Sequence, residues 1–225
     1  MENHDDFAFE PIPGLPEKLP TGESMLWQGS PVWTSLAIAA FHVRKVAIYF
    51  ALILAWQVGT GVQSGAGAGA ILTSSAWVVG VGSAAIAILA LLAWLYARGT
   101  IYTLTTRRLV IRSGLALPLT LNLPLALVET AAATPARGGI GSILLTVARP
   151  NRIAYLALWP NARPWRINNP QPLLRCLRDV DAVASLVSKA LEADATGARM
   201  PAPYRAATRP QGAVAPSTPA AGMAA

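Results

Sequence analysis

The chain has 225 residues, with 18 Lys and Arg against 11 Asp and Glu, a formal net charge of +7 and 53% hydrophobic residues. Its one cysteine, Cys176, and two histidines, His4 and His42, exclude an internal disulfide and a multi-cysteine zinc site, and they leave little basis for a nucleophile with an adjacent base. The cations are scattered and no nucleic-acid motif is present, so we expect no nucleic-acid partner. The composition therefore favours a binding protein over an enzyme.

Residues 1–30 begin with an acidic stretch and continue into a proline-rich one. No basic region precedes a short apolar run, so this start does not resemble a signal peptide. Proline fixes φ and lacks a backbone donor, which keeps a chain extended or turned. The prolines at positions 11, 13, 16 and 20 therefore predict an extended N-terminal segment.

Residues 31–45 carry a short apolar pattern. Its spacing is helical at Trp33, Leu36, Ala37, Ala40 and Phe41. The run is too short to cross a bilayer alone, so we expect an interfacial helix that leads into the next segment. A third, tilted span over residues 32–53 is the alternative, and it would have to bury or snorkel His42, Arg44 and Lys45, which is costly.

Residues 46–97 contain no Asp, Glu, Lys, Arg or His. A helix needs about 20 apolar residues to cross a bilayer core about 30 Å thick. This stretch therefore predicts a transmembrane hairpin with spans near residues 46–61 and 76–97 and a glycine-rich turn over residues 60–70. The alternative is a buried hairpin in a soluble domain, which a chain of this size has too little protein to cover.

Cationic residues flank this hairpin. Arg44 and Lys45 precede it, and Arg98, Arg107 and Arg108 follow it, whereas the turn is uncharged. Because Lys and Arg stay on the cytoplasmic side, both ends of the hairpin and both termini are expected to be cytoplasmic. These five residues are candidates for anionic lipid headgroups, at about 1 kcal/mol for each well-placed cation.

Small residues recur every four positions in the second span, at Ala76, Gly80 and Ala84. Such spacing lets helices approach closely. One interpretation is a docking face for a helix of another protein or of a second copy. The simpler interpretation, which we favour, is a seam on which the two spans of the hairpin pack together.

Residues 98–192 change to short β-branched runs separated by turns, which predict a β-sandwich or barrel. The expected strands are IYTLTT, RLVIRSG, TLNLPLALVET, SILLTVA, RIAYLALW and PWRINN. A closing helix is expected from Asn169 and Pro170, as cap and first residue. Its apolar stripe comprises Leu173, Leu177, Val180, Ala184, Val187 and Leu191. Residues 193–225 are rich in Ala and Pro and are expected to be disordered.

YTLTTRRLVIRSG (Tyr102–Gly114) and GGIGSILL (Gly138–Leu145) resemble bacterial membrane proteins with a pleckstrin-homology-like (PH-like) domain. Many relatives carry an acidic residue where this chain has Thr106 and Ser142. GLPEKLPTGESMLWQGSPVW (Gly14–Trp33) and FHVRKVAIYFALILAW (Phe41–Trp56) narrow the resemblance to the PuhB family of photosynthetic complex assembly proteins from purple bacteria. The implied fold is an α+β membrane protein, in which a transmembrane helical hairpin is followed by a PH-like β-barrel or sandwich capped by a C-terminal helix.

The resemblance implies a non-enzymatic factor of the bacterial inner membrane that binds reaction-centre and core antenna subunits. A membrane-anchored lipid- or protein-binding envelope protein with no link to photosynthesis is the alternative, and a homodimer is open. No resident cofactor is implied. His42 could ligate the magnesium of bacteriochlorophyll a, although an interfacial histidine beside Arg44 and Lys45 is the simpler interpretation.

Overall fold

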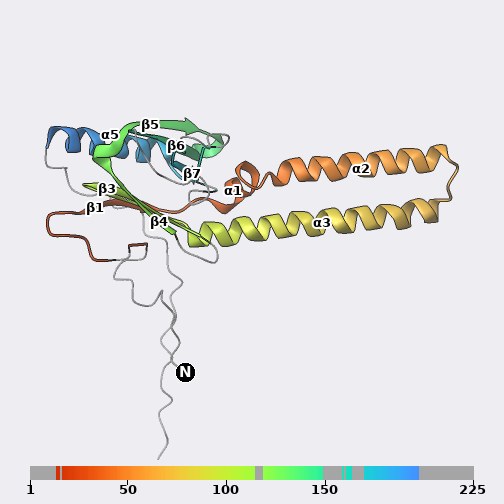
Figure 1. Cartoon of the computed structure of the whole chain (residues 1–225). Helices are drawn as coiled ribbons and strands as arrows, with labels where there is room; N and C mark the ends of the chain where they lie inside the picture. Colours follow the sequence, from red (N-terminus) through yellow and green to blue (C-terminus); the bar gives the residue numbers. More distant parts are fainter. Residues whose placement is uncertain are drawn as a thin grey trace, which may run out of the picture.

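The computed structural model describes residues 14, 15, 17–114, 119–148, 159, 161–163 and 170–197. A sandwich of two antiparallel sheets with one covering helix lies at one end, and a long helical hairpin projects from it (Figure 1). The expected strands over residues 152–159 and 164–169, the cap at Asn169 and the tail after residue 197 fall almost wholly outside the described residues.

The hairpin consists of α2 (Val43–Gln63) and α3 (Ala68–Gly99), which run side by side (Figure 1). The turn is shorter than the expected residues 60–70, because helix continues through Gln63 and resumes at Ala68. Gly65 takes a φ of 71°, Ala66 N donates to Gly61 O at 3.0 Å and Gly65 N to Val62 O at 3.1 Å. This glycine-terminated cap satisfies the last carbonyls of α2, so a tight turn suffices.

The seam between α2 and α3 does not use the predicted small residues. A Cβ on Gly82 would come within 2.9 Å of Phe50 Cγ, so Gly82 is where the helices meet closely. Ala76, Gly80 and Ala84 are exposed, and a Cβ on Gly80 would meet nothing within 4 Å. The favoured interpretation of these three residues as the internal seam is therefore wrong. Gly82 is two residues beyond Gly80, which places it on the opposite side of the helix.

A short helix, α1 (Trp33–Ala39), precedes the hairpin. The backbone breaks after it, and His42 takes a left-handed φ of 54° before α2 begins. A continuous third span over residues 32–53 is therefore wrong. Leu36 of α1 is fully buried in a small cluster with Tyr96 and Cys176, so the inner face of α1 packs on protein. Trp33 and Ile38 remain exposed.

The sandwich contains a four-stranded sheet in the order β1-β2-β3-β4 and a three-stranded sheet in the order β5-β6-β7. The strands of the first sheet are β1 (Met25–Gly29), β2 (Ile101–Thr105), β3 (Arg108–Ser113) and β4 (Leu119–Pro124). Those of the second are β5 (Val128–Pro135), β6 (Gly141–Val147) and β7 (Leu173–Leu177). Short 3-10 helices connect them, η1 (Leu125–Leu127) and η2 (Arg137–Gly139). The sheets do not close into a barrel within the described residues.

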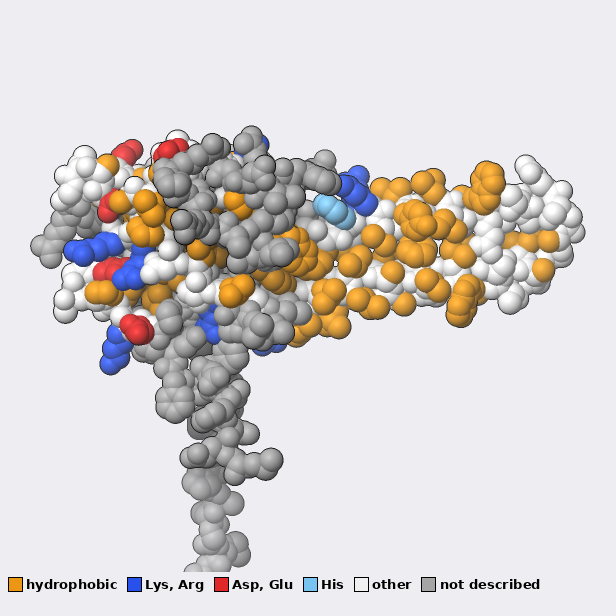
Figure 2. All heavy atoms as spheres, viewed as in Figure 1, with side chains coloured by type: hydrophobic (Ala, Val, Ile, Leu, Met, Phe, Trp, Pro, Cys, Tyr) orange, Lys and Arg blue, Asp and Glu red, His pale blue; other side chains and the backbone are white. Residues whose placement is uncertain are grey.

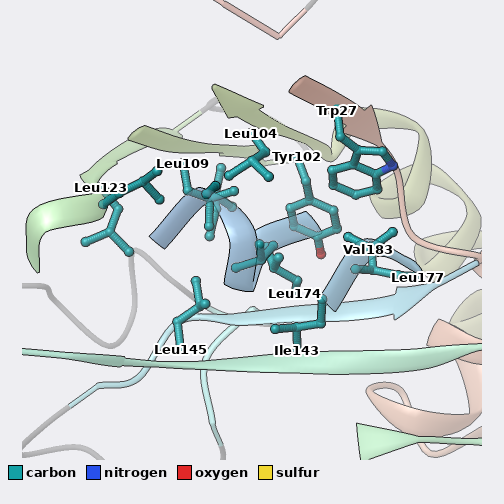
Figure 3. Packing of buried hydrophobic residues seen from close by; sticks show 14 of the residues in the cluster. Trp27, Tyr102, Leu104, Leu109, Leu123, Ile143, Leu145, Leu174, Leu177 and Val183 are labelled. Carbon is teal, nitrogen blue, oxygen red and sulfur yellow. The ribbon is translucent and has the colours of Figure 1, made fainter. Parts of the chain in front are cut away.

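The core lies between the two sheets and the closing helix α5 (Val180–Thr196). Figure 3 shows Trp27 and Tyr102 from the first sheet pointing toward Ile143 and Leu174 of the second, with Val183 of α5 beside them. Alternate residues of β6 are buried, which is the period expected of a strand with one face in a core.

Strand β1 comes from the segment that was expected to be merely extended. It pairs antiparallel with β2, with Trp27 opposite Leu104. Leu26 and Trp27 are buried in the core. The domain is therefore assembled from residues on both sides of the hairpin, and the boundaries at residues 30 and 98 cut through it.

The closing helix begins at Val180 and not near Asn169. Leu173 and Leu177 belong to β7, where Leu174 lies opposite Ile143. Cys176 and Asp179 take left-handed φ values of 52° and 49°, which a continuous helix does not allow. Leucines four residues apart suit a helix, but pairing with β6 decides the conformation here.

Candidate docking and membrane interface

The surface of the hairpin is apolar and open. Trp56 and Trp77 are each 76% exposed, and Leu72 is 69% exposed. By length and composition both helices could cross a membrane, and the most apolar windows of α2 and α3 are 0% and 11% buried inside the protein. At 21 residues α2 is about 31 Å long, close to the thickness of a bilayer core. A hairpin buried in a soluble domain is therefore not the arrangement found.

Two of the predicted cationic residues lie at the base of the hairpin. Arg44 and Lys45 are exposed in the first turn of α2, directly after His42, and Figure 2 shows basic side chains beside a histidine there. We call Arg44 and Lys45 the junction cations. Arg98 lies apart from them, exposed near the end of α3. Because Gly82 meets Phe50 across the hairpin, Arg98 is about ten residues, or about 15 Å, beyond the level of Arg44. Its guanidinium carbon is 5.0 Å from the centre of the Trp94 ring, a cation–π contact.

Arg107 and Arg108 lie elsewhere, at the β2–β3 turn. Strand β2 separates this turn from the end of α3, a distance of about 17 Å at 3.3 Å per residue. Arg108 Nη2 lies 2.6 Å from Glu23 Oε2, and Nε donates to Oε1 at 2.8 Å. The structure thus separates the five flanking cations into the two junction cations, Arg98 near the end of α3, and a pair at the far end of β2.

The Glu23 carboxylate is buried behind this arginine. It also accepts a hydrogen bond from the Thr105 hydroxyl at 2.6 Å. The bonds from Arg108 hold the pKa of Glu23 below its usual value, against the opposing effect of burial. Arg108 therefore ties the N-terminal segment to the first sheet. The sequence signal for this pair is that no other acidic residue occurs between Glu23 and Glu129.

A buried polar network joins the hairpin to the sandwich. The Tyr102 hydroxyl donates to Asn161 Oδ1 at 2.8 Å, and Asn161 Nδ2 donates to the Tyr96 hydroxyl oxygen at 3.4 Å. Arg175 N donates to the Tyr102 oxygen at 3.3 Å. Burial raises the pKa of Tyr102, so the phenol stays neutral. Because only Thr100 separates α3 from β2, the hairpin continues into the sandwich without a linker.

The outward face of α3 carries Ala76, Gly80 and Ala84 in the open. Toward the turn it continues into a shallow groove lined by Gln57, Thr73, Ser74 and Trp77. Small side chains let another helix approach the backbone closely, and amides or hydroxyls can bond across helices. This face has the surface properties of a helix-docking site.

Within the part of the chain that the structure describes, the second sheet has a covered edge at β7 and an edge without a paired strand at β5. Backbone bonds on the outer side of β7 join Gln171 to Arg163, Leu173 to Asn161, and Cys176 to Val32. Strand β5 pairs with β6 alone among the described residues. Most of its residues are exposed. An open edge presents unpaired N–H and C=O groups that can pair with another strand.

The described residues contain no group of three or more His, Cys, Asp or Glu that could hold a metal ion. Burial raises the pKa of the Cys176 thiol to about 11, so it is protonated and unreactive near neutral pH. His42 is exposed at the junction.

A two-sheet sandwich with a closing helix, joined without a linker to an apolar hairpin, defines a PH-like protein with candidate membrane helices. Residues 34–191 match the bacterial PH domain family, and the chain belongs to that family. A relative from Rhodobacter capsulatus is 36% identical over 194 residues, which is 86% of this chain and 90% of the relative. It is named "Uncharacterized 23.7 kDa protein in puhA 5'region". No solved structure matches the chain.

Proposed function

We propose that this chain is a PuhB-type, non-enzymatic assembly factor of the inner membrane, acting on the photosynthetic reaction centre and core light-harvesting complex of a purple bacterium. The observation that carries the proposal is the open apolar hairpin joined without a linker to a sandwich domain. The 36% identical relative, named for the 5′ region of puhA, supports a photosynthesis-operon context. The residues quoted above for the PuhB resemblance support the particular family.

The mechanism in this proposal is binding. The outward face of α3, with Ala76, Gly80 and Ala84, holds an apolar helix of a nascent subunit while that helix waits for its final partners. The sandwich contacts the cytoplasmic end of the same subunit. Because the hairpin continues into the sandwich without a linker, one subunit can reach both contacts.

Anionic lipid headgroups are the second proposed partner. The junction cations lie together at the start of α2, where the cytoplasmic headgroups would lie if both termini are cytoplasmic. Trp33 and Ile38 of α1 are exposed beside them and suit the interfacial region. This arrangement would fix the depth of the sandwich above the bilayer.

Deletion of the gene, followed by an absorption spectrum of the membranes, tests the assembly role. We expect weaker reaction-centre and core antenna bands in the deletion strain, and recovery when the full chain is supplied from a plasmid. Normal bands in the deletion strain would refute the proposal, because an assembly factor is needed for normal complex levels.

A general lipid- or protein-binding envelope protein is the second candidate, and the junction cations favour it. Such a protein would be expressed equally with and without photosynthetic growth. Transcript levels under the two conditions separate the candidates, since an assembly factor is expected only when the complexes are made.

A weaker proposal concerns bacteriochlorophyll a as a ligand of His42, whose side chain is exposed at the junction. Replacing His42 with Leu and measuring the pigment that co-purifies with the protein tests it. Pigment that co-purifies equally with both proteins would end the idea. Otherwise we propose no cofactor.

A further inference from the structure

Among the described residues, strand β5 pairs with β6 alone, and the backbone groups on its other edge can be assigned to particular residues. Leu145 N donates to Pro172 O, at the start of β7, so the odd-numbered residues of β6 face that strand. Ala136 N donates to Ile140 O and Ala148 N to Leu127 O, so the even-numbered residues bond across the β5–β6 hairpin. Since Ala132 lies opposite Leu144, its N–H and C=O point toward β6. The N–H and C=O of Ala131 and Ala133 therefore point away from the sheet.

The side chains of β5 leave this edge accessible. The strand reads VETAAATP over eight residues, against six in β4 at the open end of the first sheet. It has no lysine and no internal proline, which are the usual means of blocking an edge. Three consecutive alanines leave little side-chain bulk on either face. An added strand could pair here with few demands on its own sequence.

A second copy of this chain does not fit the edge. Self-pairing of one strand edge is antiparallel, with a two-fold axis perpendicular to the sheet. β5 runs roughly along the long axis of the hairpin (Figure 1). The same rotation would therefore turn the second hairpin to the opposite direction. Two such hairpins could not enter one membrane, so the occupant is a different molecule.

The direction of β5 and the charged residues near it indicate what kind of molecule could bind there. The Pro135 end of β5 leads through η2 to Ile140, which packs with Phe41 and Tyr96 at the junction, so β5 points toward the base of the hairpin. A chain that leaves the bilayer beside the hairpin would reach this edge without a bend. The one charged residue of β5 is Glu129. The exposed charged residues of α5 are Asp181, Lys189 and Glu192, so acids outnumber the single cation on these two elements. Cytoplasmic segments next to membrane helices are rich in Lys and Arg.

We infer that the β5 edge binds an extended, basic juxtamembrane segment of a second membrane protein, which adds a strand to the three-stranded sheet. The inference rests on the proposed function and names the contact made by the sandwich. Backbone bonds to Ala131 and Ala133 supply the pairing, and the acids of β5 and α5 favour a basic strand.

Proline substitutions test the edge without breaking the sheet. Ala133→Pro removes an outward N–H and spares the β5–β6 ladder, as proline does on edge strands. Asn122→Pro is the matched control on β4: Leu125 N donates to Arg107 O, so odd residues of β4 face β3 and the Asn122 N–H points outward. Equal thermal melting of the three proteins shows that both variants fold.

The probe is a synthetic peptide with one apolar span and a ten-residue extension of alternating Lys and Val, mixed with the full-length protein in vesicles. Matched probes carry alternating Pro and Val, or Glu and Val. We expect the basic probe to bind wild type and Asn122→Pro at least 10-fold more tightly than either matched probe binds them. Ala133→Pro should bind the basic probe only as weakly as wild type binds the proline probe. Equal binding of the basic probe by Ala133→Pro and wild type, or equal binding of all probes, would overturn the inference.

Complementation separates this inference from the proposed function. If the deletion strain lacks the complexes and Ala133→Pro restores them as well as wild type does, the edge is not the contact although the assembly role stands. If the deletion strain has normal bands, the assembly role fails, and the vesicle experiment still decides whether the edge binds a basic strand.

Discussion

The inner and outer faces of α3 carry glycines two residues apart in opposite surroundings. Gly82 lies against Phe50 of α2 and has no room for a side chain, whereas Gly80 faces outward with open space around it. The arginines show the same contrast. Arg108 is held by the buried carboxylate of Glu23, whereas Arg98 is exposed and makes a cation–π contact with the Trp94 ring. A residue held inside the fold reports on stability, and the same residue type in the open is available for binding.

Substitution of Gly82, the glycine packed against α2, should give the largest loss of stability. Gly82→Ile places a branched side chain where even a Cβ would lie 2.9 Å from Phe50 Cγ, so α2 and α3 must separate. Overpacking of this kind costs about 1–3 kcal/mol, and we expect the upper end because two helices have to move. Thermal unfolding of the full chain in detergent, followed by circular dichroism, measures it. An unchanged midpoint would show that the helices do not meet at Gly82.

Breaking the ion pair between Arg108 and Glu23 should give the next largest loss of stability. Glu23→Gln leaves Arg108 without its buried carboxylate, and because that arginine is 30% exposed we expect a loss of about 1–2 kcal/mol in the free energy of unfolding. Arg107→Gln is the control, since Arg107 is exposed on the same turn. Chemical denaturation of both variants at pH 7 makes the comparison, and equal losses would show that the pair adds nothing.

The pH dependence of the same pair has a definite sign. The pKa of Glu23 is lowered in the folded protein from an ordinary value of 4.5, so its stabilisation is fully present above that value. It is lost as the pH falls through the lower, folded pKa. Wild type should therefore lose more stability than Glu23→Gln on acidification from pH 6 to pH 3. Parallel curves for the two proteins would contradict the pKa shift.

The same molecule shows which structural features can be predicted from sequence alone. The charge-free stretch between Lys45 and Arg98 predicts the two long helices, because helical pairing satisfies the backbone within each apolar segment. The strand pattern from Ile101 to Val147 predicts the β-rich domain in the same way. Both features follow from the local composition of the chain.

Features that depend on distant partners could not be read in this way. Strand β1 is recognised by its pairing with β2, which is separated from it by the whole hairpin. Leu173 and Leu177 suit either a helix or a strand until β6 is in place. Which small residues of α3 meet α2 depends on the rotation of one helix against the other, and Phe50 settles it at Gly82.

The junction cations should affect membrane binding and not stability. Replacing Arg44 and Lys45 together with Ala should weaken attraction to anionic headgroups by about 2 kcal/mol, at about 1 kcal/mol per cation. The sandwich cannot be prepared without the hairpin for a flotation assay, because its strands β1 and β2 lie on either side of the hairpin in the sequence. The test is the orientation of full-length protein inserted into vesicles with and without phosphatidylserine, followed by protease access. Arg107→Ala is the comparison outside the junction, because Arg108 is needed for the ion pair with Glu23. An effect of Arg107→Ala as large as half that of the double variant would contradict the separation of the cations.

Substitution of Gly80, the exposed glycine on the outward face of α3, should give the smallest change in stability. Gly80→Ile meets nothing within 4 Å, and isoleucine forms helix slightly better than glycine, so we expect a change within about 0.5 kcal/mol. If the outward face of α3 docks a partner helix, the same variant should still lower the core antenna bands in membranes, because the bulkier side chain keeps the partner backbone away. Immunoblotting confirms that wild type and variant are present at equal levels. Normal bands at normal protein levels would show that the partner is held elsewhere, and the contrast between Gly80 and Gly82 would then concern packing alone.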